Sequence, residues 1–390
     1  MKIAHILSSF GIGGQERMAA ELSRAQRAAG HTVIAISLAG DAHGPIGETL
    51  RATGVHTFVE KKGRGLDVTL PVRLAMRLRL ERVDVVHTHN PHALVYGAPA
   101  GKLAGAATVH TKHGINPDRP RRLWLRRAAG ALVDAYVVVT PALAAVAARN
   151  RECNPARLSV VPNGIDVTVF APNPPARSEV RTALGIPAEA RVVGTVGRLA
   201  PEKDQALLVR AMLPLLDPTR QLVIVGDGPE RDALRELVRS TGCERFIHMV
   251  GARDDVARFL PAFDVFALPS LTEGLPLVLL EAMSTELVVV ASAVGGIPDL
   301  IDHGTTGFLS APGDCAGVST QLAALMADAH LAEAVGRAAR KQVRGHHSLE
   351  RMAAGYEALY GSVRSAPRSA SWACSASGPS STSTRTPRRT

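Results

Sequence analysis

Cysteine and aromatic residues are scarce in this chain of 390 residues. The 4 cysteines lie far apart, at Cys153, Cys243, Cys315 and Cys374, and no CxxC pair occurs. The sequence therefore offers neither a zinc knuckle nor a redox motif, and a reducing, cytoplasmic setting is the simplest expectation. Aromatic residues make up only 4% of the chain, so valine, leucine, alanine and isoleucine must build the core.

Uninterrupted hydrophobic runs of membrane-spanning length are also missing. Met1–Phe10 is apolar but meets a glycine-rich loop too early for a signal peptide. The best candidate for a span, Ala128–Ala148, contains an aspartate and a proline, whereas a spanning helix needs about 20 apolar residues. A buried strand at Ala135–Val139, followed by a helix that Thr140 caps and Pro141 begins, explains this segment better.

Acidic residues are absent from the C-terminal end of the chain. Lysine and arginine number 45 and aspartate and glutamate 35, a net charge of +10, and half of this excess comes from 5 arginines after residue 361. The modest remaining excess suits an anionic substrate or an anionic membrane surface. No nucleic-acid-binding motif accompanies the charge, so nucleic acid is not an expected partner. Residues 365–390 contain almost no aliphatic side chains, which predicts a disordered tail.

Strand-like and helix-like patterns alternate along the first half of the chain. A short apolar run is followed by a glycine loop, then by helical spacing over Gln15–Ala29, then by the next apolar run. This order is typical of a parallel sheet with helices on both faces. Strands are predicted at Lys2–Ser8, Thr32–Ser37, Asp84–His87, Ala107–His110 and Ala135–Val139.

A proline-rich connector, Val161–Pro175, interrupts this alternation, which then starts again. Further strands are predicted at Arg191–Val196, Gln221–Val225, Ile247–Val250, Val265–Leu268 and Leu287–Ala291. The two halves predict an α/β protein with two doubly wound domains that face each other across a cleft. We place the domains at residues 1–170 and 171–345, with a helical segment at 346–364. Ligands of such sheets bind beyond the carboxyl ends of the strands.

Two glycine loops each follow a predicted strand and precede a helical pattern. Gly11-Ile12-Gly13-Gly14 opens the first helix, where backbone amides can approach a phosphate group. The dinucleotide-binding fingerprint requires glycine at the position of Glu16, and no Walker-type GKS or GKT follows, so neither nucleotide motif is complete. The second loop, Gly226-Asp227-Gly228-Pro229, predicts a helix that begins at Pro229. Taken alone, each loop fits a plain tight turn as well as an anion site.

The segment Leu268–Asp299 carries the most specific pattern in the chain. Glu273 and Glu281 have seven residues between them, and Gly274 and Pro276 mark the change from loop to helix. Glu273 is therefore predicted at the mouth of a helix and Glu281 about one turn inside it. Together with the alanine–methionine pair that follows, this pattern resembles the donor site of the retaining glycosyltransferases of family 4.

Other segments resemble motifs of the same family, in the family's order. The resemblance covers residues 1–361 and implies the GT-B architecture, which has two Rossmann-like domains and a final helix that crosses back to the first domain. One small departure is Asp299, where many members have glutamate. The matching segments are Gly13-Gly14-x-Glu16, Thr111-Lys112-His113-Gly114, Pro162-Asn163-Gly164-Ile165-Asp166, Gly197-Arg198-Leu199 with Glu202-Lys203, and Gly226-Asp227-Gly228-Pro229.

The resemblance also implies roles for individual residues. Arg198 and Lys203 would stabilise the negative charge on the leaving diphosphate. A preorganised cation at such a position contributes a factor of about 10²–10³ in rate. Glu273 would bind hydroxyls of the donor sugar and Glu281 the ribose, because a carboxylate accepts several hydroxyl donors. His113 would lie near the anomeric carbon. Catalysis is thus assigned to Arg198, Lys203, His113 and Glu273, and donor binding to Gly13, Gly14, Gly228, Glu273, Gly274, Leu275, Pro276 and Glu281.

Two histidines, His87 and His89, lie at the end of a predicted strand. Residues two apart face the same way on a strand, so they could share a metal ion, although no acid or cysteine stands near them in the sequence. The resemblance implies a metal-independent enzyme, and the absence of Asp-x-Asp argues against the metal-dependent single-domain glycosyltransferases. We therefore expect no metal, and no cofactor besides a nucleotide-diphosphate sugar as co-substrate. His89 and Asn90, with Glu16, are assigned to the acceptor side.

A basic segment, Pro117–Arg127, carries five arginines around Leu123, Trp124 and Leu125. This combination suits contact with an anionic membrane interface through Arg119–Arg127, because tryptophan favours headgroup depth. It suits a basic helix packed on its own domain equally well.

The leading hypothesis is a retaining glycosyltransferase that moves a sugar from a nucleotide-diphosphate sugar to a glycan or lipid-linked acceptor. It would act in the assembly of a cell-surface polysaccharide or glycolipid, in the cytoplasm and peripherally at the inner face of the cell membrane. Two alternatives stay open: a GT-B sugar-nucleotide epimerase and a non-catalytic sugar-nucleotide-binding protein. The intact set of Arg198, Lys203, Glu273 and Glu281 argues against a decayed enzyme.

Overall fold

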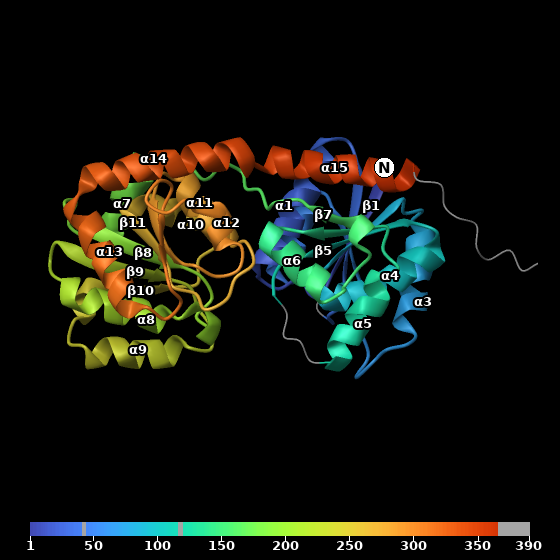
Figure 1. The fold of residues 1–390 in the computed structure, drawn as a ribbon, viewed down its shortest axis with the longest axis horizontal. Coiled ribbons are helices and arrows are strands. Elements are labelled where there is room, and N and C mark those ends of the chain that lie inside the picture. Colours follow the sequence, from blue (N-terminus) through green and yellow to red (C-terminus); the bar gives the residue numbers. More distant parts are fainter. Residues whose placement is uncertain (41–43, 116–119, 366–390) are drawn as a thin grey trace, which may run out of the picture.

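The computed structural model describes residues 1–40, 44–115 and 120–365, which form two parallel β-sheets flanked by helices. Figure 1 shows two α/β bodies side by side along the long axis of the molecule. Helix α14 (Ala329–His346) runs along one body and α15 (Leu349–Ser365) along the other. The predicted α/β class with two doubly wound domains is confirmed.

The N-terminal sheet has seven strands in the order β3-β2-β1-β4-β5-β6-β7, and its pairings are parallel. The strand order reverses between β1 and β4, so the crevice for a ligand lies beyond the carboxyl ends of these two strands. The strands are β1 (Lys2–Leu7), β2 (Thr32–Ser37), β3 (His56–Val59), β4 (Val85–His89), β5 (Ala107–Lys112), β6 (Ala135–Val138) and β7 (Leu158–Val160). The helices are α1 (Gly14–Ala28), α2 (Pro45–Ala52), α3 (Leu70–Leu80), α4 (Asn90–Ala104), α5 (Pro120–Gly130) and α6 (Pro141–Arg149).

The C-terminal sheet has six parallel strands in the order β10-β9-β8-β11-β12-β13. Its order reverses between β8 and β11, which puts the loops after these strands at the second crevice. The strands are β8 (Arg191–Val196), β9 (Arg220–Val225), β10 (Ile247–Gly251), β11 (Val265–Leu268), β12 (Val288–Ser292) and β13 (Phe308–Ser310). The helices are α7 (Pro174–Leu184), α8 (Gln205–Met212), α9 (Arg231–Ser240), α10 (Val256–Phe259), α11 (Leu277–Ser284), α12 (Ile297–Leu300) and α13 (Cys315–Ala327).

The sequence pattern does not predict three of the strands, β3, β7 and β13. Each has three or four residues, lies at the outer edge of its sheet and is mostly part-exposed, so the apolar run that marks a buried strand is absent. Several predicted boundaries also differ, and β5, for example, continues to Lys112. Strand β4 continues to His89, α7 begins inside the predicted connector at Pro174, and α9 begins at Arg231 rather than at Pro229.

The C-terminal helix α15 returns to the N-terminal domain, as the resemblance implies. It packs against α1 and β5 and buries Tyr356 and Tyr360 completely. Just before α15, Ile165 of the connector donates its N–H to the carbonyl of residue 347 at 3.0 Å and accepts from the N–H of Leu349 at 2.8 Å. The two segments that cross between the domains therefore pair with each other. Ser365, which the predicted tail included, ends α15, and residues 366–390 lie outside the described residues.

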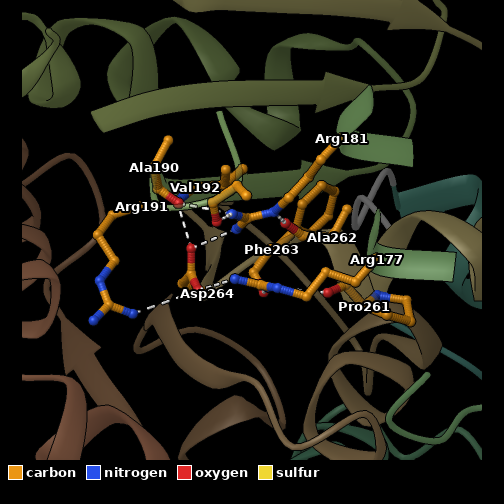
Figure 2. Close-up of polar contacts among 10 residues, drawn as sticks. Arg177, Arg181, Ala190, Arg191, Val192, Pro261, Ala262, Phe263 and Asp264 are labelled. Atoms are coloured by element: carbon orange, nitrogen blue, oxygen red, sulfur yellow. Dashed lines mark hydrogen bonds and ion pairs between the residues drawn. The ribbon is translucent and has the colours of Figure 1, made fainter. Parts of the chain in front are cut away.

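A cluster of charged side chains around Asp264 links α7 to the C-terminal sheet, as Figure 2 shows. Asp264, directly before β11, accepts from Arg177 at 2.7 Å, from Arg181 at 2.8 Å and from the backbone N–H of Val192 at 2.7 Å. Arg181 is 3% exposed, and its other N–H groups donate to backbone carbonyls of residues 188, 190 and 262. Burial lowers the pKa of Arg181, and the charge of Asp264 opposes this. The charge of Arg181 can lie inside the domain because it is paired with Asp264 and hydrogen-bonded to backbone carbonyls.

The segment considered for a membrane span folds inside the N-terminal domain. Strand β6 is fully buried, and the Thr140 side chain caps α6 by accepting from the N–H of Leu143, as predicted. Across residues 1–40, 44–115 and 120–365, no helix combines the length and the hydropathy that crossing a bilayer requires.

Candidate active site

Loops of the two domains meet at the carboxyl ends of the strands. Gly274, in the loop after β11, comes so close to the N-terminal domain that a Cβ there would stand 1.8 Å from the carbonyl oxygen of His113. Only glycine leaves room for this approach. The His113 motif and the loop of Glu273–Pro276 thus lie against each other, although they are far apart in the sequence.

Lys203 and Glu273 form an ion pair within the C-terminal part of this site. The Nζ atom of Lys203 lies 2.5 Å from Oε1 of Glu273, which also accepts from the Ser270 hydroxyl at 2.7 Å. Lys203 ends a short 3₁₀ turn after β8, whereas Glu273 follows the neighbouring strand β11. The topology therefore brings together a cation and a carboxylate that the sequence predicts from separate motifs.

Arg198 is exposed and lies on the loop that follows β8. Its backbone carbonyl accepts from Nε2 of Gln205 at 3.0 Å, while its guanidinium has no ion pair with any residue in the described ranges. The next residue, Leu199, donates its N–H to the carbonyl of Asp227 at 3.0 Å. This bond holds the Asp227–Gly228 turn beside the Arg198 loop, so the two predicted donor motifs are neighbours.

Hydrogen bonds from two sides hold the loop Glu273–Pro276, called the donor loop below. The connector residue Asn163 donates from Nδ2 to the carbonyl of Leu275 at 2.9 Å, and the N–H of Gly296 donates to the carbonyl of Gly274 at 2.8 Å. Pro276 is the residue before α11, so the unpaired backbone N–H groups at the amino end of that helix follow directly. Such a helix end favours an anion.

Glu281 lies one turn inside α11, as predicted, and is 1% exposed. Its Oε1 accepts from Arg17 of α1 at 2.8 Å, so this pair joins the two domains. Its Oε2 is buried and has no hydrogen-bond partner among the described residues. Burial raises the pKa of Glu281, and Arg17 opposes the shift. A cavity of about 340 Å³ beside the carboxylate is lined by Arg17, Leu277, Glu281, Asp254 and Asp166, among others.

His113 follows β5 directly and is neutral at pH 7, because burial lowers its pKa to about 3. Its Nε2 lies 3.1 Å from Nδ1 of His89. Its Nδ1 is buried without a hydrogen-bond partner in the part of the chain that the structure describes. Unpaired buried nitrogens are rare in folded proteins, and they call for an explanation in terms of function.

Asn90 lines a cavity of about 580 Å³ in the N-terminal domain. It has a left-handed backbone, with φ of 71°, its Oδ1 accepts from Ser8 at 2.7 Å, and its Nδ2 is buried and unpartnered among the described residues. The lining mixes polar, basic and apolar side chains and includes Gln15, Lys62, Leu66, His92, Val95, Tyr96, Arg122 and Leu125. Because it contains Asn90 and has this mixed lining, the cavity fits the predicted acceptor side.

His89 and Glu16, the other residues assigned to the acceptor side, do not line that cavity. His89 is fully buried and contacts His113 instead. Glu16 is folded over Gly13, since a Cβ on Gly13 would stand 2.2 Å from its Oε2. Gln15 donates to its Oε1 at 2.8 Å, and burial raises its pKa. Gly14 begins α1 beside it.

His87 and His89 face the same way on β4, as predicted, and His5 of β1 joins them, with nitrogen atoms within 4.8 Å of one another. Each ring nitrogen of the three already has a hydrogen-bond partner. His5 contacts His89 and Gln26, His89 contacts His113, and His87 contacts Thr111 and Tyr360. These contacts therefore engage every ring nitrogen of the cluster.

Arg17 and Ser270 are contact residues of the site that the sequence motifs did not single out. Ser270 lies within the segment 268–299, but one serine or arginine among many carries no signal of its own until the fold places it beside its partner. A larger cavity, of about 630 Å³, lies between α7, β10 and α10, and none of the motif residues lines it.

Comparison with known proteins identifies the family of the chain. The model of Glycosyltransferase Family 4 matches residues 12–169, and that of Glycosyl transferases group 1 matches residues 190–328. A UDP-Gal:alpha-D-GlcNAc-diphosphoundecaprenol alpha-1,3-galactosyltransferase from Escherichia coli is 30% identical over 67% of this chain and 71% of its own length. A D-inositol 3-phosphate glycosyltransferase from Actinosynnema mirum is 32% identical over 72% of this chain and 73% of its own. The chain belongs to glycosyltransferase family 4.

Solved structures share the fold. The crystal structure of Anabaena HepE in complex with UDP has a TM-score of 0.84 at 22% identity, over 93% of this chain and 100% of that one. Sucrose-phosphate synthase from Thermosynechococcus elongatus has a TM-score of 0.80 at 24% identity, over 93% and 99%. The protein is a glycosyltransferase with the GT-B fold.

Proposed function

We propose that this protein is a retaining, metal-independent glycosyltransferase that transfers a sugar from a nucleotide-diphosphate sugar to a lipid-linked or glycan acceptor. The observation that carries the proposal is the meeting of Lys203, Glu273 and Gly274 with His113 at the carboxyl ends of both sheets. Cations that suit a leaving diphosphate and carboxylates that suit sugar hydroxyls stand there together.

The leaving group would be stabilised by Arg198, Lys203 and the amino end of α11. These groups supply positive charge without a metal ion, and they are in place before the reaction starts. Glu273 holds Lys203 and Ser270, which favours a positioning and sugar-binding role over that of a nucleophile. The leaving phosphate would then take the proton of the attacking hydroxyl, and the sugar would keep its anomeric configuration.

The nucleoside would occupy the cavity beside Glu281. Arg17 engages only Oε1, so Oε2 can accept a ribose hydroxyl without breaking the ion pair between the domains. Anabaena HepE, which shares the fold, was crystallised with UDP and with UDP-glucose. This supports a nucleotide diphosphate as the core of the donor.

The acceptor would bind in the cavity around Asn90. Lys62 and Arg122 there suit a phosphate or diphosphate group, and Leu66, Val95 and Leu125 suit an attached apolar chain. The name of the Escherichia coli relative includes a diphosphoundecaprenol-linked acceptor. Both observations support an anionic, lipid-linked acceptor.

Membrane contact would involve the face of the N-terminal domain formed by α3, α4 and α5, of which α4 and α5 also line the cavity around Asn90. Helices α3, α4 and α5 pack side by side, and α5 exposes 66% of Trp124 between arginines. On α3, Val72, Met76 and Leu80 are 52–77% exposed at a spacing of four, which places them in one line along the helix. Of the predicted segment Arg119–Arg127, Arg119 lies outside the described residues. We propose peripheral binding to an anionic bilayer through this face.

The test is transfer itself. The purified protein is incubated without metal with each of a panel of UDP- and GDP-sugars and with an undecaprenyl-diphosphate-linked sugar on vesicles, and Lys203→Ala serves as the background control. We expect one nucleotide sugar to yield a lengthened lipid-linked product whose new bond keeps the donor's anomeric configuration by NMR. Release of a free epimerised sugar nucleotide, or inversion in the product, would contradict the proposal.

A further inference from the structure

A line of buried, hydrogen-bonded side chains leads from His113 into the N-terminal domain. His113 Nε2 lies 3.1 Å from His89 Nδ1, and His89 Nε2 lies 2.9 Å from His5 Nδ1. His5 Nε2 in turn lies 2.8 Å from the amide oxygen of Gln26, on α1. His5, His89 and Gln26 are at most 1% exposed, so water does not supply alternative partners.

The hydrogen bonds along this line must all point the same way, because a neutral imidazole carries hydrogen on only one of its two nitrogens and so donates on one side and accepts on the other. Burial lowers the pKa of His5 to about 4 and that of His89 well below its usual value, so both rings are neutral at pH 7. The oxygen of Gln26 accepts from Nε2 of His5, which leaves Nδ1 of His5 to accept from Nε2 of His89. Nδ1 of His89 then accepts from Nε2 of His113.

The amide of Gln26 also contacts helix α15. In the direction just described, its Nε2 donates to the hydroxyl of Tyr360 at 3.3 Å, and that hydroxyl can donate its own hydrogen to His87 Nδ1 at 2.7 Å. His87 Nε2, which would then carry the hydrogen of that ring, can donate to Thr111 Oγ1 at 2.7 Å. Reversing the whole line would put a hydrogen on Nδ1 of His113, which has no acceptor among the described residues. Buried N–H groups without acceptors are rare, so donation from His113 towards Gln26 is the favoured direction.

We propose that Gln26 and His5 are positioning residues of the glycosyltransfer reaction, which hold His113, through His89, in the tautomer that carries hydrogen on Nε2. Nδ1 of His113 is then a hydrogen-bond acceptor for a hydroxyl group of the bound sugar, at the point where Gly274 of the donor loop reaches the N-terminal domain. This inference rests on the proposed function for its substrate, whereas the tautomer is a property of the protein alone.

The tautomer is read by long-range ¹H–¹⁵N NMR of protein labelled with ¹⁵N-histidine, without substrate, with His113→Phe identifying the signal. We expect hydrogen on Nε2 of His113 in the wild type. Gln26→Met removes the acceptor at the end of the line and gives a mixture of tautomers, whereas Gln26→Glu keeps an acceptor and keeps the tautomer. Hydrogen on Nδ1 in the wild type, or an unchanged spectrum in Gln26→Met, would overturn the inference.

Turnover gives the second readout. In Gln26→Met we expect kcat to fall at least about fivefold, the size of one lost oriented hydrogen bond, with KM for the donor within about twofold. Gln26→Glu should recover most of kcat. The matched control is Gln221→Met, because Gln221 is also buried and pairs with a histidine, His248, but lies on β9 in the other domain. It should leave kcat unchanged.

The two proposals fail separately. If the wild type transfers no sugar from any nucleotide sugar, the proposed function fails, and the NMR spectra still decide whether the line sets the tautomer. If the wild type is active and Gln26→Met keeps a normal kcat while folded by its melting temperature, the positioning role is wrong.

Discussion

Replacement of Glu281 tests how the site holds the nucleotide. One carboxylate oxygen accepts from Arg17, and the other is buried without a partner among the described residues, so a single ribose hydroxyl is expected to donate to it. Glu281→Gln turns that charge-assisted hydrogen bond into a neutral one. Hydrogen bonds to charged groups contribute about 1.5–3 kcal/mol and neutral ones about 0.5–1.5, so the expected loss is about 1–1.5 kcal/mol.

This loss corresponds to a nucleotide affinity about five- to tenfold weaker. Glu281→Ala removes the acceptor entirely and should weaken binding about 10- to 150-fold. Neither change should unfold the protein, because Arg17 is 37% exposed and remains solvated when its partner is neutral. His113→Ala should leave the affinity within a few-fold and mainly reduce turnover, since its role is assigned to the sugar.

Isothermal titration with UDP and GDP measures these affinities, and the nucleotide that binds the wild type more tightly is used throughout. Glu21→Gln is the matched control, because Glu21 lines the same cavity but is 40% exposed and pairs with Arg24. Its affinity should stay within about twofold. Wild-type affinity in both Glu281 variants, or loss of binding in His113→Ala alone, would refute the assignment of Glu281 to the nucleotide.

Four further outcomes are expected. Arg198→Ala and Lys203→Ala should each lower turnover about a hundredfold with the fold intact, and near-normal turnover would remove that residue from the mechanism. Activity should persist in excess EDTA, because no Asp-x-Asp occurs in the chain, and its loss with recovery on adding Mn²⁺ would contradict metal independence. Asp264→Ala should cost about 3–5 kcal/mol in the free energy of unfolding measured by urea titration, because it leaves the buried Arg181 of Figure 2 without its counter-charge. The control for this titration is Glu236→Ala, which breaks an ion pair with both partners more than 60% exposed and should cost under about 1 kcal/mol. Removal of α15 should lower the melting temperature by at least several degrees, since Tyr356 and Tyr360 lose their burial, and an unchanged melting temperature would show that the helix is not part of the fold.

Local patterns identified most of the strands and the position of the donor loop. Apolar runs flanked by glycine mark a strand that is buried on both faces, so β1, β2 and β8 were predicted within about one residue. Edge strands such as β3 lack that signal because one side of them meets solvent. Gly274 and Pro276 likewise predicted where the helix that carries Glu281 begins, because glycine and proline mark the change from loop to helix.

Contacts between distant segments were not available from local patterns. The ion pair of Arg17 with Glu281 joins residues that are 264 positions apart, and nothing near Arg17 in the sequence announces it. The approach of Gly274 to His113 likewise depends on how two domains meet. The assignment of His89 to the acceptor side illustrates the limit: its place at the end of a strand was right, but its side chain turns inward to His5 and His113.

The sequence by itself therefore determined the two alternating halves, the order of the motifs and the residue types that the chemistry needs. These follow from short-range rules of periodicity, helix capping and turn geometry, which act within a few residues. Only the tertiary structure decided which side chains share a site, which of their atoms are buried without partners, and which way the histidine line points. Those properties depend on desolvation and on hydrogen-bond partners supplied by β1, β4, α1 and α15 together, and such partners exist only once these elements have packed.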